Sequence, residues 1–212
     1  MTKVYFISGL GADKRVFSFL DLSFCEPIFI DWITPLKNES LKSYALRLRK
    51  NISEPHPIIV GISFGGMLVT EMAKNDSGIR GIIISSNKIH SEFPKRLRIA
   101  KYFPIYKWLP DPILRRFILS MKGILGASGK DQKKLLGMIL KDADMPFIKW
   151  AVHAILYWGN EEIPPNIIHI HGTADRLLPY SYVKANYTIP NGTHVIPMDH
   201  PKEMSALLRQ LI

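Results

Sequence analysis

The sequence predicts an α/β fold with a mostly parallel sheet of about six strands flanked by helices. Short β-branched apolar runs alternate with amphipathic helical segments, and this alternation implies right-handed crossovers between parallel strands. The length of 212 residues suits one domain, and 47% apolar against 22% charged residues is ordinary for a soluble globule. No apolar run reaches the roughly 18 residues that would indicate a membrane span.

The strand signals are short runs of Val, Ile, Tyr and Phe that end near glycine or polar residues. The expected strands span residues 3–8, 27–32, 57–60, 79–84, 166–170 and 187–189. The run from Val4 to Leu10 is too short for a signal peptide and is interpreted as part of the first strand.

Helix signals fill the connections. Asp13 is placed to cap a short helix over 15–20, and Asn38 or Ser40 to open a longer one. Pro201 is expected to begin a closing helix. The apolar face of the longer helix comprises Leu41, Tyr44, Leu48 and Ile52. The apolar face of the closing helix comprises Met204, Leu207, Leu208 and Leu211.

Regular alternation stops between Lys88 and Trp158. This segment has no clear strand signal, and its helical patches, such as 112–122 and 132–140, are broken by proline and glycine and interleaved with aromatic residues. We interpret residues 88–158 as a helical lid inserted after the fourth strand. Residues 1–87 and 159–212 would then form the core.

The net charge of +10 is concentrated in the same segment, because residues 88–150 hold 14 Lys or Arg and 5 Asp or Glu. The chain carries no recognisable nucleic-acid recognition motif, so we expect no nucleic-acid partner. The basic segment either attracts an anionic head group, such as a phospholipid surface or an acyl-carrier phosphate, or exposes lysine and arginine for solubility.

The first chemical motif is Gly61-Ile62-Ser63-Phe64-Gly65-Gly66, which lies between an expected strand and an expected helix. Glycines two before and two after the serine remove side chains that would collide in a sharp turn. The Ser63 hydroxyl would then stand clear of the sheet edge at the head of a helix. The non-catalytic alternative is a glycine-rich turn that binds phosphate or has no chemical role.

A serine hydroxyl needs a base, and the base needs a carboxylate to orient it. Asp175 follows one expected strand in a glycine-containing loop, and His194 follows the next strand after Gly192. The carboxyl ends of parallel strands share one sheet edge, so both side chains should approach Ser63. We therefore expect Ser63 as nucleophile, His194 as base and Asp175 as acid.

These motifs resemble those of the α/β-hydrolase superfamily. GISFGG, HGTADRLLP and NGTHVIPMDHP are similar to its nucleophile elbow, acid loop and histidine loop, and SGLGADKRVF to its oxyanion loop. The resemblance covers about residues 3–86 and 164–212. It implies an α/β-hydrolase fold and an oxyanion hole made by the backbone N–H groups of Leu10 and Phe64. The chain departs from larger members by lacking two N-terminal strands, and by Ser8-Gly9 where many relatives have His-Gly.

Other titratable residues have plainer explanations. His200, directly before Pro201, suits a helix cap better than a base, and His169 alternates within a strand as a structural residue. His171 is expected to shape the acid loop. Asp199 is interpreted as a loop or cap residue, and Asp142 and Asp144, in the expected lid, are a weaker alternative to Asp175 as the acid. No metal-ligand spacing or nucleotide-binding loop occurs, so we expect no metal and no cofactor.

The sequence thus predicts a small, lid-containing serine hydrolase that cleaves carboxylic esters or thioesters through an acyl-enzyme. The alternatives are a non-catalytic binding protein on the same fold, and acyl transfer, perhydrolysis or C–C cleavage by the same residues. The expected partner is a small acyl ester or thioester. The single cysteine, Cys25, is expected to be buried and fits a reducing, cytoplasmic setting.

Overall fold

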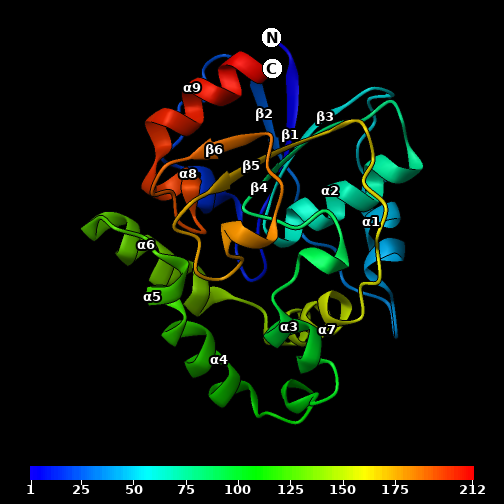
Figure 1. The fold of residues 1–212 in the computed structure, drawn as a ribbon, viewed down its shortest axis with the longest axis vertical. Helices are drawn as coiled ribbons and strands as arrows, with labels where there is room; N and C mark the ends of the chain where they lie inside the picture. The colour runs from blue at the N-terminus through cyan, green and yellow to red at the C-terminus, as the bar shows by residue number, and fades with distance from the viewer.

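The computed structural model describes residues 1–212 and contains one six-stranded sheet in which every strand runs parallel to its neighbours. The strand order is β2-β1-β3-β4-β5-β6 (Figure 1). The strands are β1 (Lys3–Ile7), β2 (Glu26–Phe29), β3 (Ile58–Ile62), β4 (Arg80–Ile84), β5 (Ile167–Gly172) and β6 (Tyr187–Ile189). The predicted fold class is therefore confirmed.

The sheet has a topological switch point between β1 and β3, because the chain leaves β1 toward β2 and then returns to its other side. In open parallel sheets, ligands bind beyond the carboxyl ends of the strands at such a point. The loop after β1 begins with Ser8 and Gly9, and the turn after β3 contains Ser63. Both lie where the topology favours a binding site.

Helices cover both faces of the sheet. Alternate side chains of β1 point to opposite faces: Tyr5 and Ile7 pack in one core cluster, and Val4 and Phe6 pack in the other. The first cluster includes residues of α1 (Leu41–Arg49) and α2 (Phe64–Asn75), and the second includes residues of η1 (Lys14–Phe17), α8 (Ile196–Asp199) and α9 (Pro201–Leu211). The buried free thiol of Cys25 belongs to the second cluster.

The segment 88–158, which we call the helical insert, connects β4 to β5 without any strand. It lies at the end of the molecule opposite the two chain termini (Figure 1). Its elements are η2 (His90–Glu92), α3 (Lys95–Ala100), η3 (Ile105–Lys107), α4 (Asp111–Ser120), α5 (Lys122–Leu125), α6 (Lys130–Asp142) and α7 (Met145–Leu156). No helix of the protein is both long and apolar enough to cross a membrane.

Local boundaries differ from the expectation in two places. The second strand ends at Phe29 instead of continuing to Trp32, whose indole Nε1–H donates to the Ala12 carbonyl at 2.8 Å. The expected short helix over 15–20 is a single 3₁₀ turn, η1, and a second such turn, η4 (Tyr180–Tyr182), lies between β5 and β6. Asp13 does cap η1, because its Oδ1 accepts from the Arg15 N–H at 2.9 Å.

Candidate active site

Ser63 occupies a strained turn between β3 and α2. Its φ of 53° and ψ of −117° lie outside the regions that residues with side chains normally adopt. A Cβ on Gly61 would come within 2.5 Å of the Gly65 carbonyl oxygen, so a side chain at Gly61 does not fit. The predicted glycine spacing therefore serves a turn that places the Ser63 side chain beyond the sheet edge.

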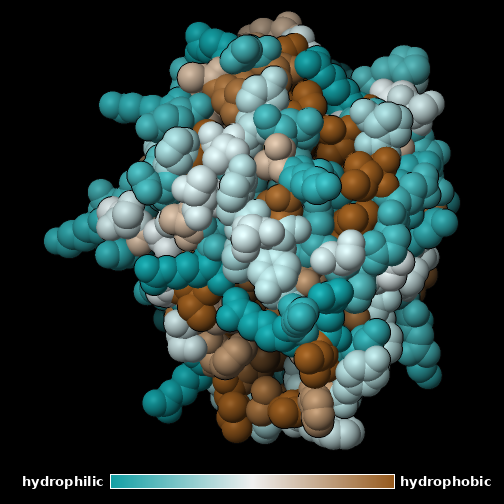
Figure 2. All heavy atoms as spheres, in the orientation of Figure 1, coloured by the Kyte–Doolittle hydropathy of each residue, from teal (hydrophilic) through white to brown (hydrophobic).

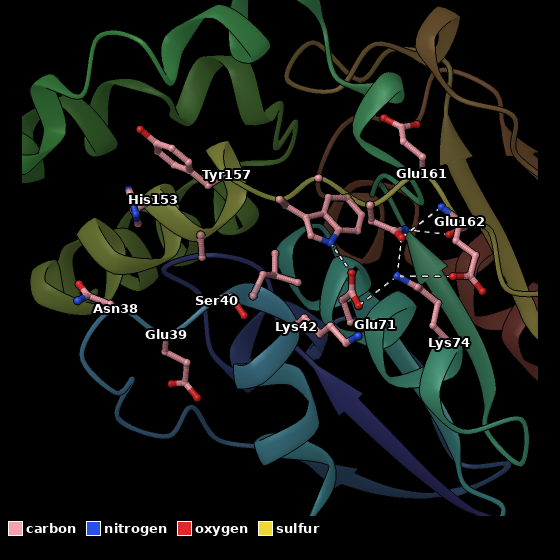
Figure 3. A pocket seen from close by; sticks show the side chains of 15 residues that line it. Asn38, Glu39, Ser40, Lys42, Glu71, Lys74, His153, Tyr157, Glu161 and Glu162 are labelled. Atoms are coloured by element: carbon pink, nitrogen blue, oxygen red, sulfur yellow. Dashed lines mark hydrogen bonds and ion pairs between the residues drawn. The ribbon is translucent and has the colours of Figure 1, made fainter.

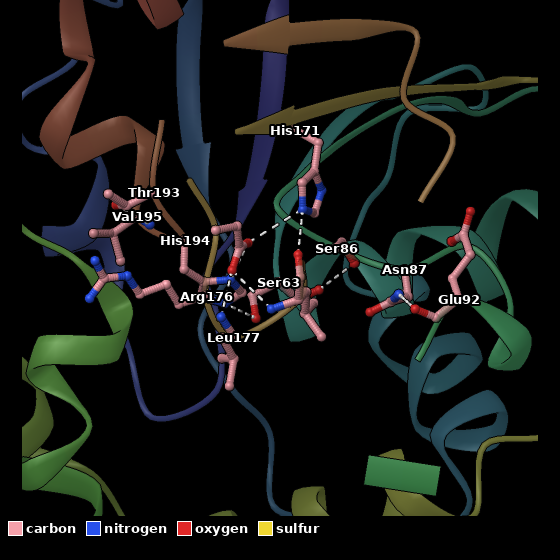
Figure 4. Close-up of polar contacts among 12 residues, drawn as sticks. Ser63, Ser86, Asn87, Glu92, His171, Arg176, Leu177, Thr193, His194 and Val195 are labelled. Atoms are coloured by element: carbon pink, nitrogen blue, oxygen red, sulfur yellow. Dashed lines mark hydrogen bonds and ion pairs between the residues drawn. The ribbon is translucent and has the colours of Figure 1, made fainter. Parts of the chain in front are cut away.

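The Ser63 backbone is held by the end of β4. Its N–H donates to the Ile84 carbonyl at 2.8 Å, and the Ser86 hydroxyl donates to the Ser63 carbonyl at 2.7 Å (Figure 4). Ser86 is fully buried, so this hydrogen bond is shielded from water. The sequence does not predict this role of Ser86, because no local pattern links it to a residue 23 positions earlier.

The structure brings Ser63, His194 and Asp175 into one hydrogen-bonded path. His194 Nε2 lies 2.8 Å from Ser63 Oγ, and His194 Nδ1 lies 2.7 Å from Asp175 Oδ2 (Figure 4). Since an ionised carboxylate only accepts, the proton sits on Nδ1 and Nε2 is free to accept from the serine hydroxyl. This is the proton arrangement that a histidine base requires.

Asp175 is buried and oriented by its own loop. Its Oδ1 accepts from the N–H groups of Leu177 and Leu178, both at 2.9 Å, which leaves Oδ2 facing His194. Burial alone would raise the pKa of Asp175, but the neighbouring His194 and these hydrogen bonds outweigh it, and the pKa is lowered. The carboxylate is therefore ionised at neutral pH.

Two further histidines support the acid loop from β5. His171 Nε2 donates to the Leu178 carbonyl at 2.8 Å, so His171 contacts that loop as expected, and it lies 3.4 Å from Asp175 Oδ2. His171 Nδ1 lies 3.0 Å from His169 Nε2, which is its donor. Burial lowers the pKa of both rings, most strongly that of His169, so both are neutral. No pattern in the sequence predicts the contact between the two rings.

The loop after β1 lies directly against Ser63. A Cβ on Gly9 would be only 3.4 Å from the Ser63 Cβ, so the two turns lie close to each other. The N–H groups of Leu10 and Phe64, on either side of this contact, have no hydrogen-bond acceptor within the protein. Both residues line the same cavity as Ser63. Two unpaired donors are thus available there for an incoming oxygen.

A cavity of about 380 Å³ opens above Ser63, and 24 of its 27 lining residues are hydrophobic. The three others are Gly9, Ser63 and His194, so the hydrogen-bonded Ser63 and His194 border a cavity that is otherwise apolar. The helical insert supplies much of the lining, including Leu114, Ile118 and Met121. Its size and lining are typical of a small-molecule site.

A second cavity, of about 620 Å³, is lined mainly by polar residues (Figure 3). Within it, the buried Glu71 of α2 accepts from the indole Nε1–H of Trp158 at 2.6 Å, and Lys74 donates to Asn160 at 2.6 Å. Because these groups satisfy one another, they tie α2 to the segment after α7. No side chain here forms a serine–histidine pair.

The competing residues do not reach Ser63. His200 occupies the N-cap position of α9 without a side-chain cap bond, and it lies 3.3 Å from Asp199. Asp142 pairs with Arg15 at 2.9 Å, and Asp144 caps α7. Asp142 and Asp144 thus have local roles away from Ser63.

Comparison of the sequence with known proteins identifies its family. A family model described as "Alpha/beta hydrolase family" matches residues 4–207. The chain belongs to this family. No curated protein sequence matches the chain.

Solved structures of alpha/beta hydrolases resemble this one in fold. An esterase from Exiguobacterium antarcticum shares 10% identity at a TM-score of 0.76, covering 100% of this chain and 91% of its own. A hydrolase from Pseudomonas aeruginosa shares 11% identity at 0.77, covering 99% and 89%. A bromoperoxidase from Bacillus anthracis shares 16% identity at 0.72, covering 100% and 92%. At such low identities the likeness concerns the fold.

Proposed function

We propose that this alpha/beta hydrolase is a serine hydrolase that cleaves carboxylic esters or thioesters. Ser63 would act as the nucleophile, His194 as the general base, and Asp175 as the group that orients His194. The observation that carries the proposal is the continuous hydrogen-bonded path from Ser63 Oγ through His194 to Asp175, beneath an apolar cavity. The esterase among the fold neighbours supports the same reaction class.

In the first half-reaction, Ser63 Oγ attacks the acyl carbonyl carbon while its proton passes to His194 Nε2. The carbonyl oxygen becomes an oxyanion that the N–H groups of Leu10 and Phe64 stabilise, an effect of about 3 kcal/mol per donor. The intermediate collapses by breaking the bond to the leaving alcohol or thiol. His194 returns the proton to that group, and an acyl ester on Ser63 remains.

The second half-reaction repeats these steps with water. Water attacks the acyl carbon as its proton passes to His194 Nε2, and the bond to Ser63 Oγ then breaks. The serine takes the proton back, and the carboxylic acid leaves. Throughout, Asp175 offsets the positive charge that His194 carries while it holds the proton. The apolar cavity would hold the acyl chain, and the helical insert would act as the lid over it.

The test is turnover of p-nitrophenyl butyrate by the wild type and by Ser63→Ala. We expect the variant to fall to the uncatalysed rate while its thermal unfolding is unchanged, because only the Oγ atom is removed. Ser128→Ala, which removes an exposed hydroxyl in the helical insert, is the matched control and should keep full activity. Turnover retained by Ser63→Ala would refute the mechanism. Comparing acyl-CoA with oxygen esters then distinguishes thioester from ester cleavage.

Transfer of the acyl group to an acceptor other than water is a second candidate. The lining of the cavity favours it, because Ser63 and His194 are nearly the only polar side chains available to hold a water molecule. The fold neighbour named as a bromoperoxidase points the same way. Adding hydrogen peroxide or an alcohol to the ester assay measures how the acyl-enzyme partitions. A product mixture that stays entirely carboxylic acid would exclude this candidate.

A further inference from the structure

The helical insert exposes a group of large apolar side chains on its outer surface. We call it the apolar tip; its members are Tyr102, Phe103, Ile105, Trp108, Ile113 and Phe117. Trp108 is 80% exposed and Phe103 67%. Apolar side chains gather at this end of the molecule, over α4 and the loop that precedes it (Figure 2). Contiguous exposed apolar residues of this kind mark an interaction surface.

The surroundings of the apolar tip are strongly basic. Residues 95–122 contain eight Lys or Arg and one acidic residue, Asp111. None of the eight cations forms an ion pair with a carboxylate, and Asp111 is itself paired with Lys149 at 2.6 Å. Arg96 and Arg115 donate to backbone carbonyls, but no carboxylate neutralises any of the eight positive charges, which gives the tip its preference for a negatively charged partner.

A bilayer of anionic phospholipid satisfies both features. Tryptophan, tyrosine and phenylalanine settle at the boundary between head groups and acyl chains, while lysine and arginine meet the lipid phosphates. A second copy of the chain would bring two uncompensated positive surfaces together. Nucleic acid would leave the aliphatic side chains of Ile105 and Ile113 without an apolar partner. The charge complementarity therefore favours the lipid surface.

The tip also lies next to the cavity. Phe117 is 60% exposed and at the same time lines the cavity above Ser63. On α4, Leu114 and Ile118 face the cavity, whereas Ile113 is exposed. The same short elements are thus apolar on their inner and outer sides. An amphiphilic acyl ester could pass from a bilayer to the cavity along continuous apolar surface.

We infer that the apolar tip and its basic surround dock the protein on anionic phospholipid membranes. The docking brings the part of the cavity wall formed by Phe117 against the lipid, so that the substrate class extends to acyl esters dissolved in the bilayer. The docking stands on the surface alone, and only the substrate route rests on the proposed hydrolase function.

The experiment uses the full chain carrying Ser63→Ala, so that hydrolysis cannot change the vesicles. Co-sedimentation measures binding to phosphatidylcholine vesicles with and without phosphatidylglycerol. We expect binding only when the anionic lipid is present, with a steep loss at high salt because the Debye length shortens. Equal binding to both kinds of vesicle, or to neither, would overturn the inference.

Two double variants separate the apolar and basic contributions. Phe103→Ser with Trp108→Ser, neither of which lines the cavity, should weaken binding at least tenfold. Lys101→Gln with Lys107→Gln should weaken it about 25-fold, since one cation near an anionic surface is worth about fivefold. No loss in either variant would refute the assignment of the surface.

Matched controls remove the same groups elsewhere. Leu36→Ser with Ile163→Ser deletes two exposed apolar side chains outside the helical insert, and Lys37→Gln with Lys202→Gln deletes two exposed cations. Both should bind as tightly as the parent.

Sedimentation velocity tests whether the tip instead binds a second copy of the chain. A dimer of the wild type that becomes monomeric in Phe103→Ser with Trp108→Ser would assign the tip to that role. Turnover of a water-soluble ester without vesicle binding would refute the docking and leave the hydrolase intact.

Discussion

Replacing Asp175 by asparagine should inactivate the enzyme by reversing the proton positions on His194. The N–H groups of the half-buried Leu177 and the buried Leu178 both point at Oδ1 at 2.9 Å, and leaving either unpaired costs about 1–3 kcal/mol. The asparagine oxygen must therefore occupy the Oδ1 position, which puts the amide nitrogen 2.7 Å from His194 Nδ1. Two donors cannot meet there, so Nδ1 becomes the acceptor and the proton moves to Nε2.

His194 Nε2 lies 2.8 Å from Ser63 Oγ, and once protonated it cannot take the serine proton. Restoring the active tautomer means leaving both N–H donors opposed, at a cost of about 2–6 kcal/mol. This corresponds to a loss of between about 30-fold and 10⁴-fold in kcat. KM should change little, because Asp175 does not line the cavity.

The assay compares kcat and KM for p-nitrophenyl butyrate in Asp175→Asn and in Asp199→Asn. Asp199 is the matched control, because it lies five residues from His194 and its Oδ2 accepts from the Thr193 N–H, which an amide oxygen also does. We expect the control to stay within about threefold of wild type. Asp175→Asn retaining more than a tenth of wild-type kcat would refute the tautomer argument.

Three other predictions follow from the same structure. Gly65→Ala should destabilise the fold by about 3 kcal/mol in urea unfolding, because its Cβ would lie 2.5 Å from the Ile7 carbonyl oxygen, whereas Gly123→Ala in α5 meets nothing within 4 Å and should not destabilise. His169→Gln should flatten the acid side of the stability profile. Burial, and then His171, hold the pKa of His169 well below its usual value of 6.5, so the unfolded chain takes up a proton that the folded one excludes. This contribution is present above pH 6.5 and lost at about 1.4 kcal/mol per pH unit as pH falls toward the folded pKa; a variant that keeps the wild-type slope would contradict it. Lengthening the acyl chain of p-nitrophenyl esters from two carbons should raise kcat/KM about fourfold per methylene until the cavity is filled, and a flat series would argue against an apolar acyl site.

The sequence predicts those parts of the site that short local sequence patterns mark. Ser63 follows a β-branched run and is flanked by spaced glycines, and Asp175 and His194 each follow a strand near a glycine. Because the carboxyl ends of parallel strands lie at one edge of the sheet, these local signals are enough to predict that the three residues lie close together. The hydrogen bonds at 2.7 and 2.8 Å agree with that expectation.

Local sequence patterns do not predict the contacts that support the site, because these contacts join segments far apart in the chain. Ser86 beneath the Ser63 turn, and Trp158 on the buried Glu71, join segments whose packing no spacing reveals. Aromatic residues occur throughout the helical insert, but Phe117 lines the cavity whereas Phe103 and Trp108 are exposed and do not. Short helices broken by proline and glycine can be apolar on two sides, and periodicity does not tell which side faces the core.

The most direct measurement of the central claim is covalent labelling by a fluorophosphonate, followed by peptide mapping. The account predicts one adduct on Ser63, absent in Ser63→Ala and formed at least a hundredfold more slowly in His194→Ala, since the base at 2.8 Å is lost. An adduct on another residue, or labelling of Ser63 at an unchanged rate without His194, would contradict it.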